Sequence, residues 1–369
     1  MLTRRGALAI VSAGVLAISA TLFAQGKNAP QVDQKKLNDA QKKEVAAVQT
    51  VADAAMIGQL APNDLGLAWV HEDTLKATEH RTYMPYVVTI DSSKLTGATV
   101  GIYWRVVSKD QAAAMTAAAA PPANGKKDDK KQPAARPMFT DEEFTPATIP
   151  SGQTGPVKLT RSFTVPAGSY DVYVVVKEPT PDKKGAPQGK TSVVKQSVTV
   201  PDLWNDELNT SSVIVAERLD PLPAPLTPQQ MIERPYALGA MEIVPATSTK
   251  FTTKNELQPF ILIYNAKLDS GNKPDVSVEY NFCQAAAGSE AKDPCKAGEK
   301  FFNKTNPQDL NAKTLPPGFD VAAGHQLQSG QAIPLASFPP GDYRLEIKVT
   351  DKIASKSITR EVNFSVSGS

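Results

Sequence analysis

Apolar and polar residues alternate with a period of two along most of the chain. This pattern is typical of β-strands that place one face on a core. In the first half the alternating apolar positions are Tyr86, Val88 and Ile90; Val100, Ile102, Trp104 and Val106; and Tyr170, Val172, Val174 and Val176. In the second half they are Phe260, Leu262 and Tyr264; Val276, Val278, Tyr280 and Phe282; and Tyr343, Leu345, Ile347 and Val349.

The two halves of the chain resemble each other at a nearly constant spacing. Residues 84–91 match 258–265 at an offset of 174, and residues 165–170 match 338–343 at an offset of 173. The strand that begins at Val100 matches the later one at an offset of 176. Three landmarks in the same order predict a tandem duplication. Short strands without interleaved helices favour antiparallel sandwiches over a parallel α/β sheet.

One helix is expected ahead of the strands, over residues 33–57. Its apolar face at helical spacing consists of Val45, Val48, Ala52, Ala55 and Met56. We expect this face to pack against the following domain. Self-association with a second chain, as a weak coiled coil through the 33–57 helix, is the alternative. The fold class is therefore mainly β, with two tandem antiparallel β-sandwiches preceded by one N-terminal helix.

Residues 1–24 have the pattern of a secretory signal peptide. Arg4 and Arg5 precede an uncharged stretch of apolar and small residues, and Ala24 is a suitable last residue before cleavage. We expect export to the periplasm or the extracellular space, without a transmembrane segment in the mature chain. In an oxidising compartment Cys283 and Cys295 are expected to form a structural disulfide that closes a hairpin loop.

Composition divides the rest of the chain into segments. Residues 112–137 are rich in alanine, proline and lysine and are expected to be a disordered insert. The predicted organisation is a signal peptide over 1–24, a polar stretch and helix over 25–62, a first β-sandwich over 63–202, a Pro-rich linker over 203–239 and a second β-sandwich over 240–369.

A turn of the form Pro-x-Gly-x-Tyr opens one strand in each half, at Gly168 and at Gly341. Glycine permits the tight turn, and the tyrosine hydroxyl can bond to nearby backbone as in a tyrosine corner. The phrase Pro-Gly-Asp-Tyr-Arg-Leu-Glu-Ile-Lys-Val-Thr-Asp over 340–351 resembles the immunoglobulin-like and fibronectin type III-like sandwiches of secreted bacterial proteins. More loosely, the layout resembles the β-rich regions that accompany von Willebrand A or Gly-Trp-x-Thr-Asp domains. The resemblance covers 65–200 and 240–366, and it implies a fold rather than an activity.

Charge and composition restrict the possible functions. The chain carries 40 Lys and Arg against 38 Asp and Glu, and loss of residues 1–24 would leave 38 of each. A neutral chain is unsuited to nucleic acid, which requires a concentrated basic surface. Three histidines and two cysteines leave little material for a metal centre. His71 and His80 lie near acids, but their spacing matches no zinc signature, and we expect them to be exposed.

A few further residues are candidates for metal binding or for surface contacts. Asp91 and Ser93 match the start of a metal-dependent adhesion motif, but Leu95 stands in place of its second serine. Trp104 lies on the apolar side of its strand and is expected in the core, whereas Trp204 is the better candidate for an exposed contact. The sequence contains no nucleophile elbow and no phosphate-binding loop, so we predict no catalytic, cofactor-binding or metal-ligating residues.

These observations predict an exported, non-catalytic binding or structural spacer protein of the cell envelope. It would act through β-sandwich loops and edges on a protein or another envelope component. A carbohydrate-acting enzyme or its accessory module is one alternative, because two well-placed carboxylates suffice for glycoside hydrolysis. A metal-dependent adhesin, based on Asp91 and Ser93, is the other alternative.

Overall fold

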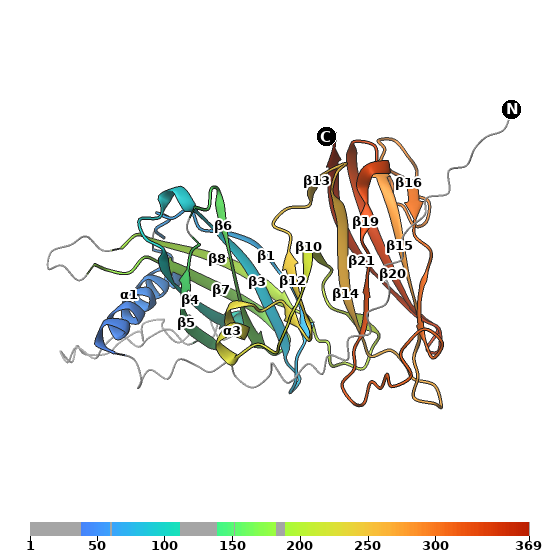
Figure 1. Cartoon of the computed structure of the whole chain (residues 1–369), viewed down its shortest axis with the longest axis horizontal. Helices are drawn as coiled ribbons and strands as arrows, with labels where there is room; N and C mark the ends of the chain where they lie inside the picture. Colours follow the sequence, from blue (N-terminus) through green and yellow to red (C-terminus); the bar gives the residue numbers. More distant parts are fainter. Residues whose placement is uncertain (1–37, 60, 111–138, 151, 182–188, 369) are drawn as a thin grey trace, which may run out of the picture. The chain divides into compact units, whose positions relative to one another are not determined.

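The structure is a computed structural model of the chain that describes residues 38–59, 61–110, 139–150, 152–181 and 189–368. The predicted signal peptide, the predicted insert over 112–137 and the first residues of the predicted helix lie outside these ranges. The chain divides into two compact units, each a β-sandwich (Figure 1). The prediction of a mainly β fold with two sandwiches is confirmed.

The first sandwich comprises the described residues up to Asp202 and the segment Thr227–Pro235. Its strands are β1 (Ala68–Glu72), β2 (Leu75–Lys76), β3 (Thr82–Asp91), β4 (Thr99–Ser108), β5 (Asp141–Thr148), β6 (Pro156–Val165), β7 (Gly168–Lys177) and β8 (Thr191–Val200). In one sheet β3 pairs with β1, β2 and β6, and the other sheet has the order β5-β4-β7-β8. All these pairings are antiparallel.

The second sandwich comprises residues 203–226 and the described residues from Tyr236 onward. Its strands are β9 (Asn209–Thr210), β10 (Ile214–Pro221), β11 (Ala237–Leu238), β12 (Met241–Pro245), β13 (Lys250–Thr252), β14 (Glu256–Tyr264), β15 (Asp275–Ala285), β16 (Glu299–Lys304), β17 (Gln308–Asn311), β18 (Leu327–Gly330), β19 (Ile333–Pro334), β20 (Gly341–Asp351) and β21 (Lys356–Ser367). One sheet contains β11-β12-β10-β14-β18, and the other contains β13-β21-β20-β15-β16.

The alternating residues form the two cores, as the period-two pattern predicts. In the first sandwich the inward side chains of β3 and β6 pack on those of β4 and β7, and Trp104 is only 1% exposed. In the second sandwich the inward side chains of β14 meet those of β15 and β20. Burial of these alternating faces is the main contribution to the stability of each unit.

Equivalent strands pair in the same order in both sandwiches. The β5-β4-β7-β8 order of the first corresponds to β16-β15-β20-β21 in the second. The predicted tyrosine corners are present: the Tyr170 hydroxyl donates to the Pro166 carbonyl at 3.0 Å, and the Tyr343 hydroxyl donates to the Pro339 carbonyl at 2.6 Å. The glycine two residues before each tyrosine has a φ angle of +154°. Residues with a Cβ atom rarely adopt this backbone conformation. These matching details favour the predicted duplication.

The expected linker over 203–239 is largely part of the two folds. Strand β10 pairs with β14 and β12 inside the second sandwich. The short helix α3 (Pro228–Glu233) packs on the first sandwich, where Ile232 joins the core and Thr160 Oγ1 donates to the Glu233 carbonyl at 3.1 Å. A linker assignment for the whole range is wrong, because its apolar residues are used by both cores.

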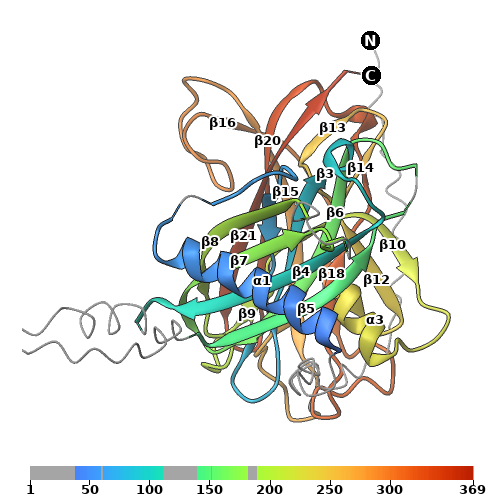
Figure 2. The same cartoon turned by 90° about the vertical axis from the view of Figure 1, so that its left-hand side faces the viewer.

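Helix α1 (Asp39–Met56) begins with a capping box in which Asn38 and Gln41 bond each other's backbone. It lies across the outer face of the β5-β4-β7-β8 sheet (Figure 2). Val48 and Ala52 are fully buried there against Tyr103, Val175 and Val193. The helix therefore packs on the following domain, as expected, and self-association through the 33–57 helix stays a prediction.

In the part of the chain that is described, no helix combines the length and the apolar character needed to cross a bilayer.

Candidate functional site

The predicted disulfide between Cys283 and Cys295 is present, with their Cα atoms 5.7 Å apart. It joins the end of β15 to the loop that leads into β16. Backbone bonds close the same loop, because the Ala286 amide donates to the Gly298 carbonyl at 2.7 Å and Lys292 bridges Cys295. The disulfide and these bonds fix the loop over 286–298.

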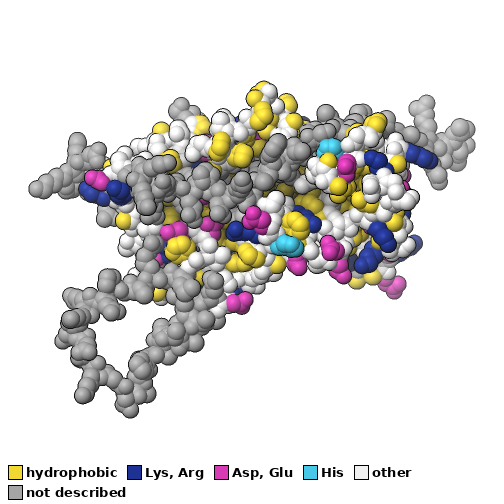
Figure 3. Space-filling view, turned by 90° about the horizontal axis from the view of Figure 1, so that it is seen from below, with side chains coloured by type: hydrophobic (Ala, Val, Ile, Leu, Met, Phe, Trp, Pro, Cys, Tyr) yellow, Lys and Arg dark blue, Asp and Glu magenta, His cyan; other side chains and the backbone are white. Residues whose placement is uncertain are grey.

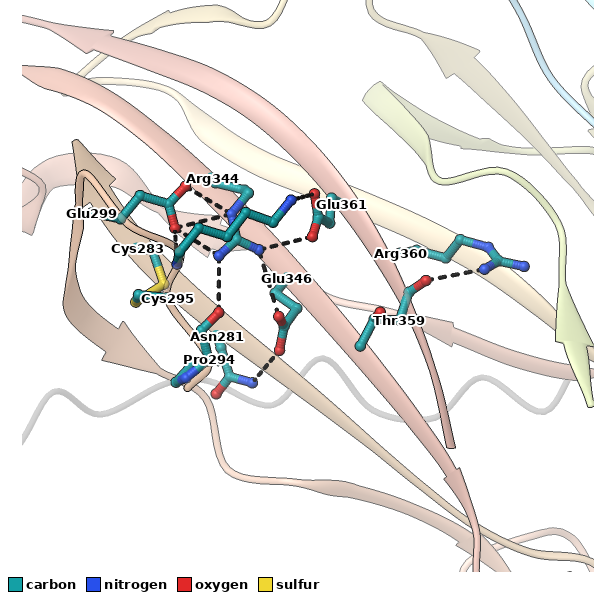
Figure 4. Close-up of polar contacts among 11 residues, drawn as sticks. Asn281, Cys283, Pro294, Cys295, Glu299, Arg344, Glu346, Thr359, Arg360 and Glu361 are labelled. Carbon is teal, nitrogen blue, oxygen red and sulfur yellow. Dashed lines mark hydrogen bonds and ion pairs between the residues drawn. A yellow bond between two sulfur atoms is a disulfide. The ribbon is translucent and has the colours of Figure 1, made fainter. Parts of the chain in front are cut away.

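This loop lies beside Arg344, the centre of a polar cluster in the second sandwich (Figure 4). We call Arg344, Glu299, Glu346, Glu361 and Lys296 the Arg344 cluster. The Arg344 side chain is only 4% exposed. Its Nη2 donates to Glu299 Oε2 at 2.7 Å, and its Nε donates to Glu299 Oε1 at 2.8 Å. This is a two-pronged ion pair of the kind that fixes orientation as well as charge.

The remaining donors of Arg344 are also used. Nη1 lies 3.1 Å from Glu361 and 3.5 Å from Glu346, and Nη2 donates to the Pro294 carbonyl at 2.9 Å. Lys296 Nζ donates to Glu361 at 2.5 Å, which ties the loop to β21. The cluster therefore links three strands and the disulfide loop.

The electrostatics of the Arg344 cluster keep Arg344 and Glu299 charged. The hydrogen bond from Arg344 lowers the pKa of the Glu299 carboxyl, and the same bond raises the pKa of Arg344. Both groups are thus held in their ionised forms. A proton donor or acceptor that works near neutral pH requires the opposite shift for a carboxyl group.

An open groove of about 320 Å³ passes beside this cluster. It is lined by Thr249, Lys250, Ala285, Glu299, Asp342, Tyr343, Arg344, Asn363, Phe364 and Ser365. Two of the charged residues that line it, Arg344 and Glu299, are bonded to each other. Polar and aromatic residues of β20 and β21, together with Thr249, Lys250 and Ala285, form the rest of its wall.

Cys283, Cys295 and Glu299 place their ligand atoms within 4.8 Å of one another, close enough to suggest a metal site. The two sulfurs are bonded to each other, however, and both Glu299 oxygens accept hydrogen bonds from Arg344. A disulfide lacks the thiolate that binds zinc. These residues therefore do not fit a metal ion in the oxidised protein.

The first sandwich has a different polar cluster, at the interface between α1 and the sheet. The fully buried Arg105 forms an ion pair with Asp53 of α1, and its Nε donates to the Tyr103 hydroxyl at 2.8 Å. Further along α1, Lys177 Nζ donates to Glu44 at 2.7 Å. Burial raises the pKa of Glu44, but the hydrogen bonds from Lys177 and Thr180 outweigh it, and the pKa is lowered.

A third polar group lies inside the first sandwich. Burial raises the pKa of the Glu143 carboxyl to about 7, and Asp141 adds to the shift while Arg161 opposes it. Glu143 is 8% exposed. Its Oε1, the Tyr86 hydroxyl and the Trp104 indole nitrogen are buried without a hydrogen-bond partner among the described residues. The neighbourhood suits a neutral carboxylic acid, since nothing around that oxygen donates to it.

The other candidates from the sequence have local structural roles. Asp91 Oδ1 accepts from the Ser93 amide at 3.0 Å and from its hydroxyl at 2.6 Å, which caps the short 3₁₀ turn after β3. β3 belongs to an antiparallel sheet, not to the parallel α/β sheet that the adhesion motif requires. Nδ1 of His71 lies 3.4 Å from Oδ2 of Asp73, and His80 is exposed.

Trp204 is partly buried rather than fully exposed, and its role as a contact stays a prediction. Sequence reasoning missed Arg105, Glu143 and Arg344. Arg105 lies between the apolar residues Trp104 and Val106 in the sequence, and this could have suggested that it is buried. Glu143 lies directly opposite Trp104 on the neighbouring strand. Arg344 alternates with the apolar residues of its strand as Glu346 and Lys348 do, and this pattern gives no sign that Arg344 is buried.

Charges of both signs are interspersed over the described surface that Figure 3 displays, as the nearly neutral composition predicts. Comparison with known proteins adds no relative: no protein-family model matches this sequence, and no curated protein is significantly similar to it. The function is therefore inferred from the geometry described above.

Proposed function

We propose that the chain is an exported, non-catalytic protein of the cell envelope that binds or spaces other envelope components. Its contacts would be made by the loops and edges of its two β-sandwiches, where such folds usually place recognition. Protein or another envelope component would be the partner.

The state of the Arg344 cluster carries the non-catalytic part of this proposal. The cluster lies beside an open groove, and Arg344 bonds all three of its acids. Glycoside hydrolysis needs an acid with a raised pKa facing the substrate. Glu299, which lines the groove, has a lowered pKa. The acid with a pKa near 7, Glu143, is buried inside a sandwich.

Two further observations support export and binding. The Cys283–Cys295 disulfide is typical of oxidising compartments and agrees with the signal pattern of residues 1–24. Phe301 of the outer strand β16 is 50% exposed beside this disulfide. Aromatic residues are enriched at protein interfaces, so Phe301 is the contact that the experiment tests.

The experiment has a localisation arm and a binding arm. The full chain is produced in a bacterial host and the compartments are separated. We expect the protein outside the cytoplasm, with its N-terminus at Gln25 by intact mass and no maleimide-reactive thiol before reduction. The recovered protein is then sedimented with isolated envelopes. Phe301→Ser should weaken binding at least fivefold, whereas Val321→Ser, another exposed apolar position, should not.

Hydrolysis provides the opposing result. The same protein is incubated with envelope polysaccharides, and reducing ends are measured. Release of reducing ends that disappears in Glu299→Gln or Glu361→Gln would replace the proposal with the carbohydrate-acting alternative. Retention in the cytoplasm with both thiols free would overturn the export part.

A further inference from the structure

Strand β8 forms the outer edge of the β5-β4-β7-β8 sheet. It pairs with β7 from Lys177↔Thr191 to Gly168↔Val200 without a register shift. At its start the other edge is covered, because the Val193 amide donates to the Pro62 carbonyl at 2.9 Å and the Thr191 carbonyl accepts from Asp64 at 3.1 Å. The odd-numbered residues of β8 therefore direct their backbone groups away from β7.

Beyond Val193 this edge is open. Among the described residues, the amides of Lys195, Ser197 and Thr199 have no backbone partner outside the ladder with β7. The Ser197 carbonyl accepts only a 3.4 Å bond from the side chain of Gln196. The side chains of the three odd residues are exposed, and Val193 is the β8 residue in the apolar cluster under α1.

Edge strands usually carry devices that prevent pairing with other chains, such as proline, bulges, charges or a covering segment. The other edge of this sheet and the edges of the equivalent β13-β21-β20-β15-β16 sheet have them. β5 contains Pro146, and β16 has a register shift next to Lys300 and Lys304. β21 carries Lys356, Arg360 and Glu361, and β13 covers its end.

The open part of β8 carries one charge, Lys195, and has no proline, bulge or covering strand among the described residues. Residues 194–200, Val-Lys-Gln-Ser-Val-Thr-Val, contain neither proline nor a bulge and are rich in β-branched residues. Their one charged residue, Lys195, lies 2.7 Å from Asp171 on β7 and is neutralised by it. Pairing at this edge would therefore neither bury a free charge nor break the ladder with β7.

We propose that the β8 edge is a homodimer interface, in which residues 194–200 pair antiparallel with the same residues of a second copy. A two-fold axis makes any antiparallel strand pair self-complementary, and two-fold dimers are the commonest oligomers. Ser197 is the middle of the three open positions, so an axis at Ser197 uses all three amides. Lys195 then faces Thr199 of the other copy, and the two lysines are not opposed. This interface does not depend on export or on the absence of catalysis.

Proline substitution at the axis provides the first test. Ser197→Pro removes an amide that points away from β7, so the ladder with β7 is kept. Ser197→Ala is the matched control, because it also loses the bond from the Ser197 hydroxyl to Asp171 but keeps the amide. Sedimentation velocity from 1 to roughly 300 µM should show a monomer–dimer equilibrium for the parent and Ser197→Ala, in the micromolar range typical of modest interfaces. Ser197→Pro should weaken dimerisation at least tenfold.

Cysteine substitution tests the register independently of stability. Directly opposed residues in a hydrogen-bonded pair have Cα atoms about 5.5 Å apart, within disulfide range. Ser197→Cys should therefore form an intermolecular disulfide under mild oxidation. Thr199→Cys, which would face Lys195 of the second copy, should not. A chain that stays monomeric at the highest concentration overturns the proposal. The proposal is also overturned if Ser197→Pro dimerises as strongly as Ser197→Ala, or if the two cysteine variants form intermolecular disulfides to the same extent.

Discussion

Asp53 of α1 and Arg105 of β4 form an ion pair beneath the helix, where the Arg105 side chain has no solvent exposure and that of Asp53 is 31% exposed. Arg105 also bonds Glu142 and the Tyr103 hydroxyl, so its charge is compensated inside the interface. The Asp53–Arg105 and Glu44–Lys177 ion pairs fix the helix on the sheet at two separate points. The apolar contacts of Val48 and Ala52 lie along the helix between them.

This ion pair predicts a specific loss of stability. Arg105→Ala would leave Asp53 and Glu142 without their buried counter-charge, and breaking such a pair costs about 3 kcal/mol in free energy of unfolding. Urea denaturation measures the loss. Lys42→Ala is the control, because Lys42 pairs with Asp39 on the exposed side of the same helix and should cost under about 0.5 kcal/mol. Equal effects of the two substitutions would mean that Arg105 does not hold the helix.

Glu143 predicts an unusual dependence of stability on pH. The pKa of the Glu143 carboxyl rises from 4.5 in the unfolded chain to about 7 in the fold, so the folded state favours the protonated acid. The stability that Glu143 contributes is fully present below pH 4.5 and is lost as the pH rises through 7. The loss amounts to about 3 kcal/mol in the free energy of unfolding. The Tm of the parent should fall between pH 5 and pH 8 relative to that of Glu143→Gln.

The control for this experiment is Glu299→Gln. The pKa of Glu299 is lowered, so its contribution is lost toward acid pH and has the opposite sign. The difference in Tm between parent and Glu143→Gln should therefore change between pH 5 and pH 8, and the difference for Glu299→Gln should not. A Glu143→Gln curve parallel to the parent curve would contradict a raised pKa.

The bonds of Arg344 predict that the order of the disulfide loop depends on its guanidinium group. Lysine has one compact charge and cannot bond Glu299 through two nitrogens while reaching the Pro294 carbonyl. Arg344→Lys should lower the free energy of unfolding by about 2 kcal/mol and increase amide exchange over 286–298. Arg218→Lys, on a side chain that is 58% exposed, should change neither quantity. Unchanged exchange in Arg344→Lys would show that the disulfide alone orders the loop.

The strand pattern predicted the sandwiches because alternation reports directly which face is buried. In β20 the outward residues Arg344, Glu346 and Lys348 are charged, and they line the outer face of the sheet. In β7 the outward residues Tyr173 and Val175 are apolar, and both are buried under α1 or beside it. A continuous apolar run indicates a strand buried on both faces, so this part of the helix contact was also encoded in the sequence.

Other features required the register in space. The prolines of 221–225 suggested a linker, although Ile214 and Ala216 alternate like a strand and Thr227 with Gln230 has the spacing of a capping box. The partners of Arg344 lie 45 and 17 residues away along the chain, at Glu299 and Glu361. Only the pairing of β20 with its neighbours brings them together, so a single sequence does not identify this cluster.

The tyrosine corners test the equivalence of the two sandwiches. Tyr170 and Tyr343 each donate to a carbonyl four residues earlier, and Gly168 and Gly341 precede them with the same φ of +154°. Tyr170→Phe and Tyr343→Phe each remove one hydroxyl and leave the Pro166 or Pro339 carbonyl without it. Each should lower the free energy of unfolding by about 1 kcal/mol, measured by urea denaturation with an unfolding probe in each sandwich. Tyr264→Phe is a comparison outside the corners.

The position of each loss is as informative as its size. The sandwich that carries the substitution should be destabilised, and its probe should shift, because each corner bonds within its own unit. Similar losses at the two sites would support corners inherited by duplication, since equivalent bonds in equivalent turns stabilise by similar amounts. A loss at Tyr343 with none at Tyr170 would instead indicate that the shared turn no longer has the same role in the first sandwich, even though the backbone conformation is the same.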